Sequence, residues 1–81
     1  MYKVYVIKSV RRHNRYVGST EDVEKRIAEH NAGKCRYTKG RLPWKLIHLE
    51  SCHSRSEAMQ KEKFLKSGQG RKWLDKILSN S

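Results

Sequence analysis

The stretch that decides the fold is Tyr2-Lys3-Val4-Tyr5-Val6-Ile7-Lys8-Ser9, which is followed, after a short polar segment, by Arg15-Tyr16-Val17-Gly18. Both runs are rich in Val, Ile and Tyr, which favour β-strands, and the polar segment between them favours a turn. We therefore predict a β-hairpin. Pairing of its strands can bring Tyr5 and Tyr16 to the same face, although the loop leaves the register open.

A helix is predicted directly after the hairpin, from Ser19-Thr20 to about Ala32-Gly33. Thr20 can accept hydrogen bonds from free backbone N–H groups at the helix start, and acidic residues in the first turn complement its positive end. Val23 and Ile27 are one helical turn apart, so we expect them to form the buried stripe.

The middle of the chain predicts a loop and one more strand. Residues 34–43 have no hydrophobic period and carry several basic side chains, which is typical of a loop. Residues 44–49 predict a strand with apolar side chains on both faces. Such a pattern favours a central strand that helices cover.

The last third of the chain predicts two helices. Ser54-Arg55-Ser56-Glu57 is a capping-box pattern, so a helix should begin there and run to about Ser67, where glycines interrupt it. A final helix should span residues 71–78. Its apolar face should cover the core with Trp73, Leu74, Ile77 and Leu78. The sequence thus predicts one domain over residues 1–81 with an α+β fold: a three-stranded, mainly antiparallel sheet flanked by helices, in the order β-β-α-β-α-α.

The charge of the chain indicates a polyanionic partner. There are 19 Lys and Arg against 8 Asp and Glu, which gives a net charge of +11. Nucleic acid is the common partner of such an excess, because each neutralised phosphate releases a counterion. A membrane is disfavoured, since the basic residues are scattered and no lipidation signal, signal peptide or transmembrane stretch is present. We therefore expect a cytoplasmic protein that binds DNA, with RNA as the other candidate.

The two cysteines, Cys35 and Cys52, stand outside any C-x-x-C spacing. This favours reduced thiols in the cytoplasm over a disulfide. A zinc site that combines them with His48 and His53 is conceivable, but the spacing matches no zinc-finger pattern.

One acidic residue interrupts the apolar pattern of the helix predicted from Ser54. With Ala58 at 0° and about 100° per residue, Leu65 falls near −20°, Glu62 near 40° and Met59 near 100°, so Glu62 should lie within the apolar stripe. Burying an ionised carboxylate without a partner is costly, so Glu62 should pair with a cation or bind a metal. From this helix alone, a structural salt bridge is the simpler reading.

The chain also offers candidates for phosphodiester hydrolysis, which needs a hard cation, a base for water and positive charge near the phosphate. Glu62 could hold Mg²⁺ or Mn²⁺ through one carboxylate, while water and phosphate complete the shell. A nearby tyrosine could deprotonate the attacking water, with His30 as the proton acceptor. Arg26, one helical turn before His30, could donate to a phosphate oxygen.

Five motifs in this order resemble the GIY-YIG nuclease domain. They are Lys3-Val4-Tyr5, Tyr16-Val17-Gly18, the segment from Ser19 to Arg26, His30-Asn31, and the helix from Glu57 to Lys66 that contains Glu62. The resemblance runs from about Tyr2 to Leu78 and is close to the small stand-alone members described as UvrC-like. Lys3 replaces the first glycine of the name-giving motif and Val4 its isoleucine, whereas both motif tyrosines are kept.

The resemblance implies a β-β-α-β-α core in which Tyr5 and Tyr16 face the active site. It also implies that Arg26 and His30 act from the first helix and that Glu62 binds the divalent ion. Relatives include the incision subunit of nucleotide excision repair, homing endonucleases and restriction enzymes, so DNA repair or processing is the expected setting. We favour Tyr5 with His30 as the general base and Tyr16 as a ligand of phosphate or water.

Each of these residues has a simpler alternative role. The two tyrosines could be aromatic residues that pack the sheet. His30 could cap the negative end of its helix, and Arg26 could be a solvated flank residue. The basic loop could be a solvated face, or it could bind backbone phosphates while Tyr37 stacks on a base. The residues expected to contact nucleic acid are Gly18, Lys34, Arg36, Tyr37, Lys39 and Arg41.

Two functions from different classes follow from these patterns. The first is a metal-dependent endonuclease that cuts DNA with low sequence selectivity, and the second is a nucleic-acid-binding module of the same fold without turnover. The complete set of site residues favours the first. We expect a monomer or weak homodimer that either cuts with poor selectivity or depends on a partner for targeting, because relatives that cut defined sites usually carry extra binding modules.

Overall fold

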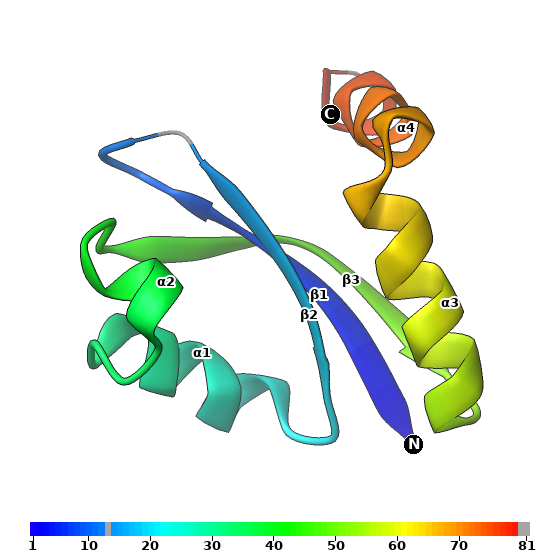
Figure 1. Cartoon of the computed structure of the whole chain (residues 1–81), viewed down its shortest axis with the longest axis horizontal. Helices are drawn as coiled ribbons and strands as arrows, with labels where there is room; N and C mark the ends of the chain where they lie inside the picture. Colours follow the sequence, from blue (N-terminus) through cyan, green and yellow to red (C-terminus); the bar gives the residue numbers. More distant parts are fainter. Residues whose placement is uncertain (13, 80–81) are drawn as a thin grey trace.

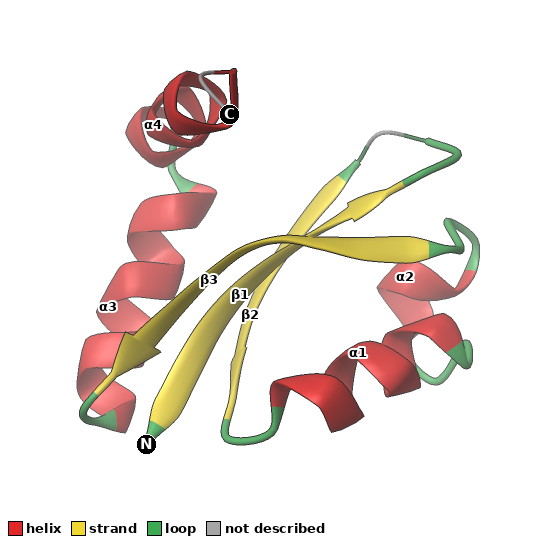
Figure 2. Ribbon diagram, turned by 180° about the vertical axis from the view of Figure 1, so that it is seen from behind, coloured by secondary structure: helices red, strands yellow, loops and turns green. Residues whose placement is uncertain are grey.

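The computed structural model describes residues 1–12 and 14–79. Its elements are β1 (Tyr2–Ser9), β2 (Arg15–Thr20), α1 (Val23–Asn31), α2 (Arg36–Lys39), β3 (Trp44–Cys52), α3 (Arg55–Lys66) and α4 (Gly68–Ser79). The strands form an antiparallel sheet in the order β2-β1-β3, with α1 and α2 on one face and α3 and α4 on the other (Figure 1, Figure 2). The predicted α+β fold is confirmed, with α2 as an additional short helix. The hairpin loop contains His13, which lies outside the described residues.

The hairpin of β1 and β2 fixes the register that the sequence left open. Tyr5 pairs with Gly18 and Ile7 with Tyr16, so the side chains of both tyrosines lie on the face covered by α1. Their ring centroids are 6.4 Å apart. β2 continues past the predicted end at Gly18 and reaches Thr20.

The central strand is β1, and the prediction of a central strand at residues 44–49 was wrong. β3 pairs with β1 alone and forms an edge of the sheet. Its apolar residues on both faces arise from a register shift between Val6 and Ile7 of β1. This irregularity leaves Ile47 without a partner in the register, and Ile47 packs on the α3 side while Trp44 packs on the α1 side.

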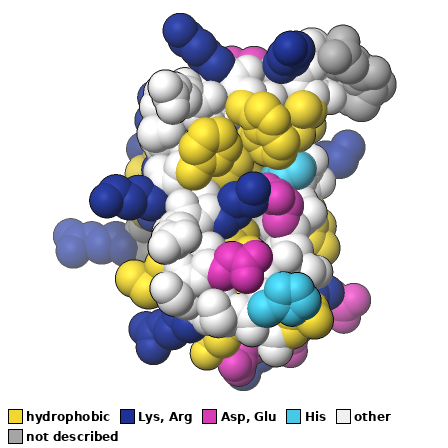
Figure 3. Space-filling model, turned by 90° about the vertical axis from the view of Figure 1, so that its right-hand side faces the viewer, with side chains coloured by type: hydrophobic (Ala, Val, Ile, Leu, Met, Phe, Trp, Pro, Cys, Tyr) yellow, Lys and Arg dark blue, Asp and Glu magenta, His cyan; other side chains and the backbone are white. Residues whose placement is uncertain are grey.

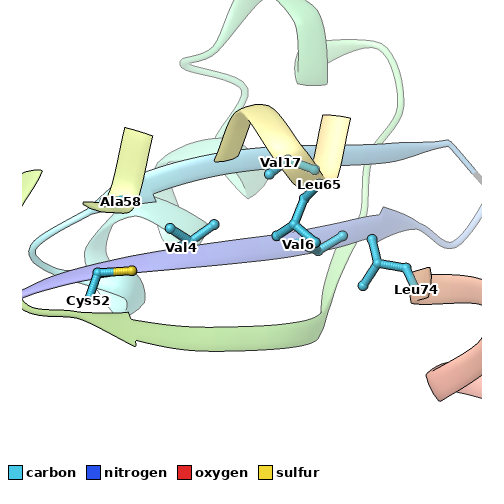
Figure 4. Packing of buried hydrophobic residues seen from close by; sticks show 7 residues of the cluster. All are labelled: Val4, Val6, Val17, Cys52, Ala58, Leu65 and Leu74. Atoms are coloured by element: carbon cyan, nitrogen blue, oxygen red, sulfur yellow. The ribbon is translucent and has the colours of Figure 1, made fainter. Parts of the chain in front are cut away.

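Two hydrophobic clusters hold the helices on the sheet. The cluster on the α3 side consists of Val4, Val6, Val17, Cys52, Ala58, Leu65 and Leu74 (Figure 4). The cluster on the α1 side is built on Tyr5, Ile7 and Trp44. Because side chains alternate along a strand, β1 contributes to both clusters and directs Tyr5 toward α1.

The N-cap of α1 is Asp22, not the predicted Thr20. The Asp22 carboxylate accepts a hydrogen bond from Lys25 N at 3.1 Å, whereas Thr20 Oγ1 accepts from Asp22 N at 3.2 Å. The helix ends before Gly33, as predicted, and the φ of 78° at this glycine is the left-handed conformation that glycine adopts without strain. The fully buried residue of α1 is His30, while the predicted stripe is only partly buried.

The predicted loop at residues 34–43 contains the short helix α2. Cys35 is its N-cap residue, and Thr38 is fully buried. Trp44 Nε1 donates a hydrogen bond to the Thr38 carbonyl at 2.9 Å. Thr38 also contacts His30 of α1. Because α2 is held by these contacts to β3 and α1, the hydrophobic pattern of the segment does not predict the helix.

The junction of α3 and α4 is tighter than the sequence predicts. The predicted N-cap of α3 is confirmed, since Ser54 Oγ accepts from Glu57 N at 3.1 Å, while the Glu57 carboxylate accepts from His53 N at 3.3 Å and not from Ser54 N. α4 already begins at Gly68, so the glycines form its first turn. A Cβ on Gly70 would lie 1.9 Å from the Phe64 carbonyl oxygen, so this glycine allows α4 to start directly against the end of α3.

Trp73 differs from its predicted place in the lid over the core. Leu74 is buried, but Trp73 is 36% exposed, because neighbouring helical residues are rotated by about 100° and only one of the two can face the sheet. The Trp73 ring lies edge-on to His48 at 5.5 Å and to Phe64 at 6.2 Å. Figure 3 shows hydrophobic side chains gathered into a patch on this side of the molecule, with basic, acidic and histidine side chains beside it.

The two thiols are free and lie on opposite sides of the sheet, Cys52 in the α3-side cluster and Cys35 at the start of α2. Within residues 1–12 and 14–79, no helix has the length and apolar composition needed to cross a membrane.

Candidate active site

Three hydrogen-bonded side chains lie on the α1 face of the sheet. Tyr5 Oη is 2.9 Å from His30 Nε2, and His30 Nδ1 is 2.9 Å from Thr38 Oγ1. Thr38 Oγ1 donates to the Cys35 carbonyl at 3.3 Å, so it accepts the hydrogen bond of His30 Nδ1–H. His30 Nε2 is therefore an acceptor, and the Tyr5 hydroxyl donates to it.

Burial keeps both titratable groups of this network uncharged near neutral pH. It lowers the pKa of His30, and the charge of Arg26 contributes to the same decrease. Burial raises the pKa of Tyr5 to about 12, although the nearby Arg26 acts in the opposite direction. A neutral imidazole and a protonated phenol are the species that the hydrogen bonds require.

Gly18 makes room for the Tyr5 ring. A Cβ on Gly18 would lie 2.5 Å from Tyr5 Oη and 2.7 Å from Tyr5 Cζ. The phenol therefore lies directly against the glycine, and any side chain at this position would displace it. The sequence predicts Gly18 as a nucleic-acid contact; in the structure it is buried and supports Tyr5.

Two more tyrosines extend from His30 to the surface. The Tyr16 ring lies edge-on to His30 with centroids 4.9 Å apart, and Tyr37 lies 5.7 Å from Tyr16. Tyr16 is partly exposed, and Tyr37 is 46% exposed. We call Tyr5, Tyr16, Tyr37 and His30 the tyrosine cluster. It joins three predicted catalytic residues to Tyr37, which the sequence assigned to nucleic-acid contact from the basic loop.

Arg26 lies beside the tyrosine cluster. Burial has the larger effect on the pKa of Tyr5 and raises it, while the nearby Arg26 lowers it. The guanidinium is therefore close to the phenol. Arg26 Nη1 is 3.4 Å from Glu29 Oε1, and the arginine side chain is 37% exposed. A guanidinium in this position can donate to a phosphate oxygen that reaches the cluster.

Glu62 lies at the edge of the apolar stripe of α3, not within it as predicted. Ala58 and Leu65 are buried, but Met59 is 57% exposed, so the buried stripe is narrower than the sequence indicates. The Glu62 side chain is 25% exposed, and its Oε1 is 3.5 Å from Lys66 Nζ. Among the described residues, no hydrogen bond or ion pair joins Glu62 to the tyrosine cluster. The salt bridge, the simpler reading of this helix, is the arrangement in the structure.

Glu62 would bring a single carboxylate to a metal ion. Residues 1–12 and 14–79 contain no group of three His, Cys, Asp or Glu suited to a metal. Mg²⁺ commonly keeps several waters and takes one or two carboxylates together with substrate phosphates. The partly exposed oxygens of Glu62 fit a site of that kind, whereas a cage built wholly from protein ligands does not fit here.

The basic residues of the segment 34–43 surround α2 at the surface. Lys34, Arg36 and Lys39 are exposed. Arg41 donates from Nη1 to the Tyr37 carbonyl at 2.7 Å, and its guanidinium lies over the Tyr37 ring at 4.6 Å. The segment thus places exposed cations beside the outermost ring of the tyrosine cluster.

Sequence reasoning missed Thr38, the residue that orients His30. It is a threonine within a basic stretch, and its neighbours give no sign that it is buried. A signal exists only in three dimensions, where α2 folds back and brings Thr38 Oγ1 to His30 Nδ1.

Comparison with known proteins identifies relatives of this chain. The sequence matches the GIY-YIG catalytic domain over residues 1–74. It is 51% identical over 63 residues to the UPF0213 protein VNG_2274C of Halobacterium salinarum, a match that covers 76% of this chain and 80% of that protein. It is also 51% identical over 53 residues to the UPF0213 protein NP_0776A of Natronomonas pharaonis, with 64% of this chain and 62% of that protein covered.

A solved structure shares the fold. The solution NMR structure of the UPF0213 protein BH0048 from Bacillus halodurans has a TM-score of 0.57 and 33% sequence identity, and the match covers 95% of this chain and 85% of that chain. The domain match spans every residue of the candidate site, from Tyr5 on the first strand to Glu62 on α3. Sequence, fold and motif order therefore agree, and the chain belongs to the GIY-YIG family.

Proposed function

We propose that this chain is a divalent-metal-dependent endonuclease that hydrolyses DNA phosphodiester bonds with low sequence selectivity. The observation that carries the proposal is the buried hydrogen-bonded series of Tyr5, His30 and Thr38 beside Arg26. It holds a neutral imidazole against a phenol, which is the arrangement that proton removal from a nucleophile requires. The GIY-YIG catalytic domain match supports a nuclease reaction.

His30 is the proposed proton acceptor. Its Nε2 accepts the Tyr5 hydroxyl over 2.9 Å. If Tyr5 passes this proton to Nε2 while its oxygen takes a proton from the attacking water, negative charge does not build up on the buried phenol. This coupling is needed because the pKa of Tyr5 is about 12, so a free phenolate is rare at neutral pH. Thr38 is a positioning residue that holds the imidazole in the accepting tautomer.

The substrate should approach from the side of Tyr16. Tyr5 is only 1% exposed, whereas Tyr16 is partly exposed, so Tyr16 is the proposed ligand of the phosphate or the water. Arg26 is the proposed donor to the phosphate oxygen that gains charge in the transition state. Mg²⁺ or Mn²⁺ bound at Glu62 would polarise the phosphate and lower the pKa of a coordinated water.

The ion pair of Glu62 does not oppose this role. Lys66 follows Glu62 by one helical turn, and its side chain is 56% exposed. Exposed pairs with this spacing contribute about 0.3–0.5 kcal/mol, so a divalent cation can replace the ammonium at little cost. We therefore propose Glu62 as the metal ligand and Lys66 as its partner when no ion is bound.

Two observations favour a second candidate, a nucleic-acid-binding module without turnover. The Tyr5 hydroxyl is enclosed, and Glu62 forms no hydrogen bond or ion pair with the tyrosine cluster among the described residues. In that case the basic surface would hold the nucleic-acid backbone, and no bond would be cleaved.

A nicking assay on supercoiled plasmid with Mg²⁺ or Mn²⁺ separates the two functions. Glu62→Gln removes the charge and keeps the shape, and it should lower the cleavage rate at least about 100-fold, or about 2.7 kcal/mol of barrier, because the ion loses its protein ligand. Glu57→Gln on the same helix is the matched control and should cut like the wild type. Binding in EDTA should be similar in all three proteins.

Equal cleavage by the wild type and Glu62→Gln would end the metal assignment. A wild type that binds DNA but cuts neither plasmid nor structured substrates would favour the binding module. We further propose that the protein acts in the cytoplasm in DNA repair or processing, as a monomer or weak homodimer that a protein partner targets. The exposed cations of the segment 34–43 support low selectivity, because contacts to backbone phosphates carry no sequence information.

A further inference from the structure

A groove of about 520 Å³ lies along the edge strand β2. Tyr16 and Tyr37 line it from the α1 side, and Leu65 and Leu74 line it from the α3 side. Because both faces of the sheet contribute, the groove wraps around the edge of the sheet. Val17 of β2 also lines it, so the wall combines aromatic rings with aliphatic side chains.

The charge of the groove is one-sided. Its lining includes four basic residues and no acidic residue. The basic residues are Lys8, Arg15, Lys66 and Arg71. A second hollow at the start of α1 is balanced, with three acidic and three basic residues. The groove along β2 is therefore suited to a polyanion, and the hollow at α1 is not.

A row of like charges crosses the sheet at one end of the groove. Lys8 of β1 lies directly opposite Arg15 of β2 and Lys45 of β3. Residues opposite each other share a face, and like charges in that position destabilise a sheet. Asp75 of α4 pairs with Arg15 at 2.5 Å, but no acidic partner within residues 1–12 and 14–79 forms an ion pair with Lys8 or Lys45. The row keeps positive charge that a bound anion would neutralise.

We propose that this groove binds an unpaired segment of nucleic acid, with its phosphates on Lys8, Lys66 and Arg71 and a base on the rings of Tyr16 and Tyr37. The proposal rests on the proposed nuclease function and names its substrate class: single strands, flaps and overhangs. A basic groove with aromatic rings is the pattern of single-strand binding, because every base has a face that can stack.

The size of the groove favours an unpaired strand over a duplex. Its volume of about 520 Å³ is in the range of roughly 300–1,000 Å³ that small-molecule sites have. A space of this size accepts a nucleotide or two but not a continuous double helix. The aliphatic wall also suits a base or a sugar. An unpaired base is free to reach this wall, whereas a base in a duplex is held by its partner.

The groove adjoins both parts of the proposed active site. Tyr16 belongs to the tyrosine cluster and to the groove. Lys66 belongs to the groove and pairs with Glu62 at 3.5 Å. A strand that binds here therefore passes between the proposed proton acceptor and the proposed metal ligand.

Fluorescence anisotropy in EDTA tests binding without cleavage. The probes are a labelled oligothymidine, an oligouridine of the same length and a blunt DNA duplex. The test variant combines Lys8→Gln with Arg71→Gln, and the matched control combines Lys63→Gln with Lys72→Gln, which are exposed on α3 and α4 outside the groove. Glutamine removes the charge and keeps the side-chain stem, and a thermal melt verifies that each variant is folded.

The test variant should bind the single strands at least about tenfold more weakly at low salt. Its slope of log Kobs against log salt should be shallower by about 1.4, which is about 0.7 for each lost phosphate contact. The control should keep the wild-type affinity within about twofold. Tyr37→Leu should weaken single-strand binding without a change in slope, because stacking releases no counterion. The wild type should bind both oligonucleotides more tightly than the duplex.

Equal losses of affinity in the test and control variants would refute the groove as the binding site and indicate diffuse charge attraction. Duplex binding as tight as single-strand binding would overturn the substrate class. The result is separable from the nuclease proposal. Cleavage that depends on Glu62, with unchanged binding in the test variant, would refute the groove as the binding site and support the nuclease function. Binding that depends on the groove, without cleavage, would support the groove and refute the nuclease function.

Discussion

Gly18→Ala is expected to disable the candidate site through Tyr5 alone. The new methyl carbon would lie 2.5 Å from Tyr5 Oη and 2.7 Å from Tyr5 Cζ, distances that a Cβ does not tolerate. The ring has little freedom to move aside. Tyr5 is 1% exposed, and its hydroxyl is held by His30 at 2.9 Å. The substitution must therefore displace the phenol and break its hydrogen bond.

Two effects set the size of the change in stability. Extra volume in a packed core costs about 1–3 kcal/mol. Loss of the Tyr5 hydroxyl leaves His30 Nε2 buried without its donor, and an unsatisfied buried group costs about 1–3 kcal/mol. Partial relaxation of the chain reduces the sum, so we expect the free energy of unfolding to fall by about 3 kcal/mol.

Urea denaturation measures this change, and Gly40→Ala is the matched control because no heavy atom lies within 4 Å of a Cβ at that glycine. The control should cost less than about 0.5 kcal/mol. A double-mutant cycle with Tyr5→Leu assigns the effect to the ring. In that background Gly18→Ala should be milder by at least about 1 kcal/mol. A cost below about 0.5 kcal/mol, or the same cost with and without the ring, would refute the reasoning.

Two other predictions concern the same hydrogen bonds. Thr38→Val keeps the shape but removes the acceptor of His30 Nδ1–H, so it should destabilise the fold by about 1–3 kcal/mol and slow plasmid nicking; nitrogen NMR of His30 should then report a shift away from the Nδ1–H tautomer, and an unchanged tautomer would contradict the assignment. Because the pKa of Tyr5 rises from 10.0 to about 12 on folding, its contribution is complete below pH 10 and is lost as the pH rises to about 12. The loss should reach about 2.7 kcal/mol in urea titrations at alkaline pH, and it should vanish in Tyr5→Phe.

The elements with a clear hydrophobic period could be predicted from the sequence. The run of Val, Ile and Tyr in β1 and the Ser54 N-cap specify local structure, and the strand and the helix both appear where expected. α2 could not be predicted, because Thr38 is buried by contacts to His30 and Trp44, which are eight and six residues away and belong to other elements. Such helices depend on tertiary contacts more than on local propensity.

The candidate site follows the same division. The pattern predicts the face on which a side chain lies, and the structure confirms that Tyr5 and Tyr16 share one. It does not predict depth. Tyr5 is almost fully enclosed, while Glu62 is at the rim of its stripe, because burial depends on how far α1 and α3 extend over the sheet. A helical wheel of α3 does not show how much of the helix surface the neighbouring strands will bury.

The strand order decides how the two halves of the site can act together. His30 belongs to the side of the sheet that α1 covers, and Glu62 belongs to α3 on the other side (Figure 1). A sheet with β2 inside would separate them with backbone and side chains. Since β2 is an edge strand, a substrate that wraps around Tyr16 can contact both halves of the site at once. Under the proposed nuclease function, the substrate would complete the site, and no direct bond between the two halves is needed.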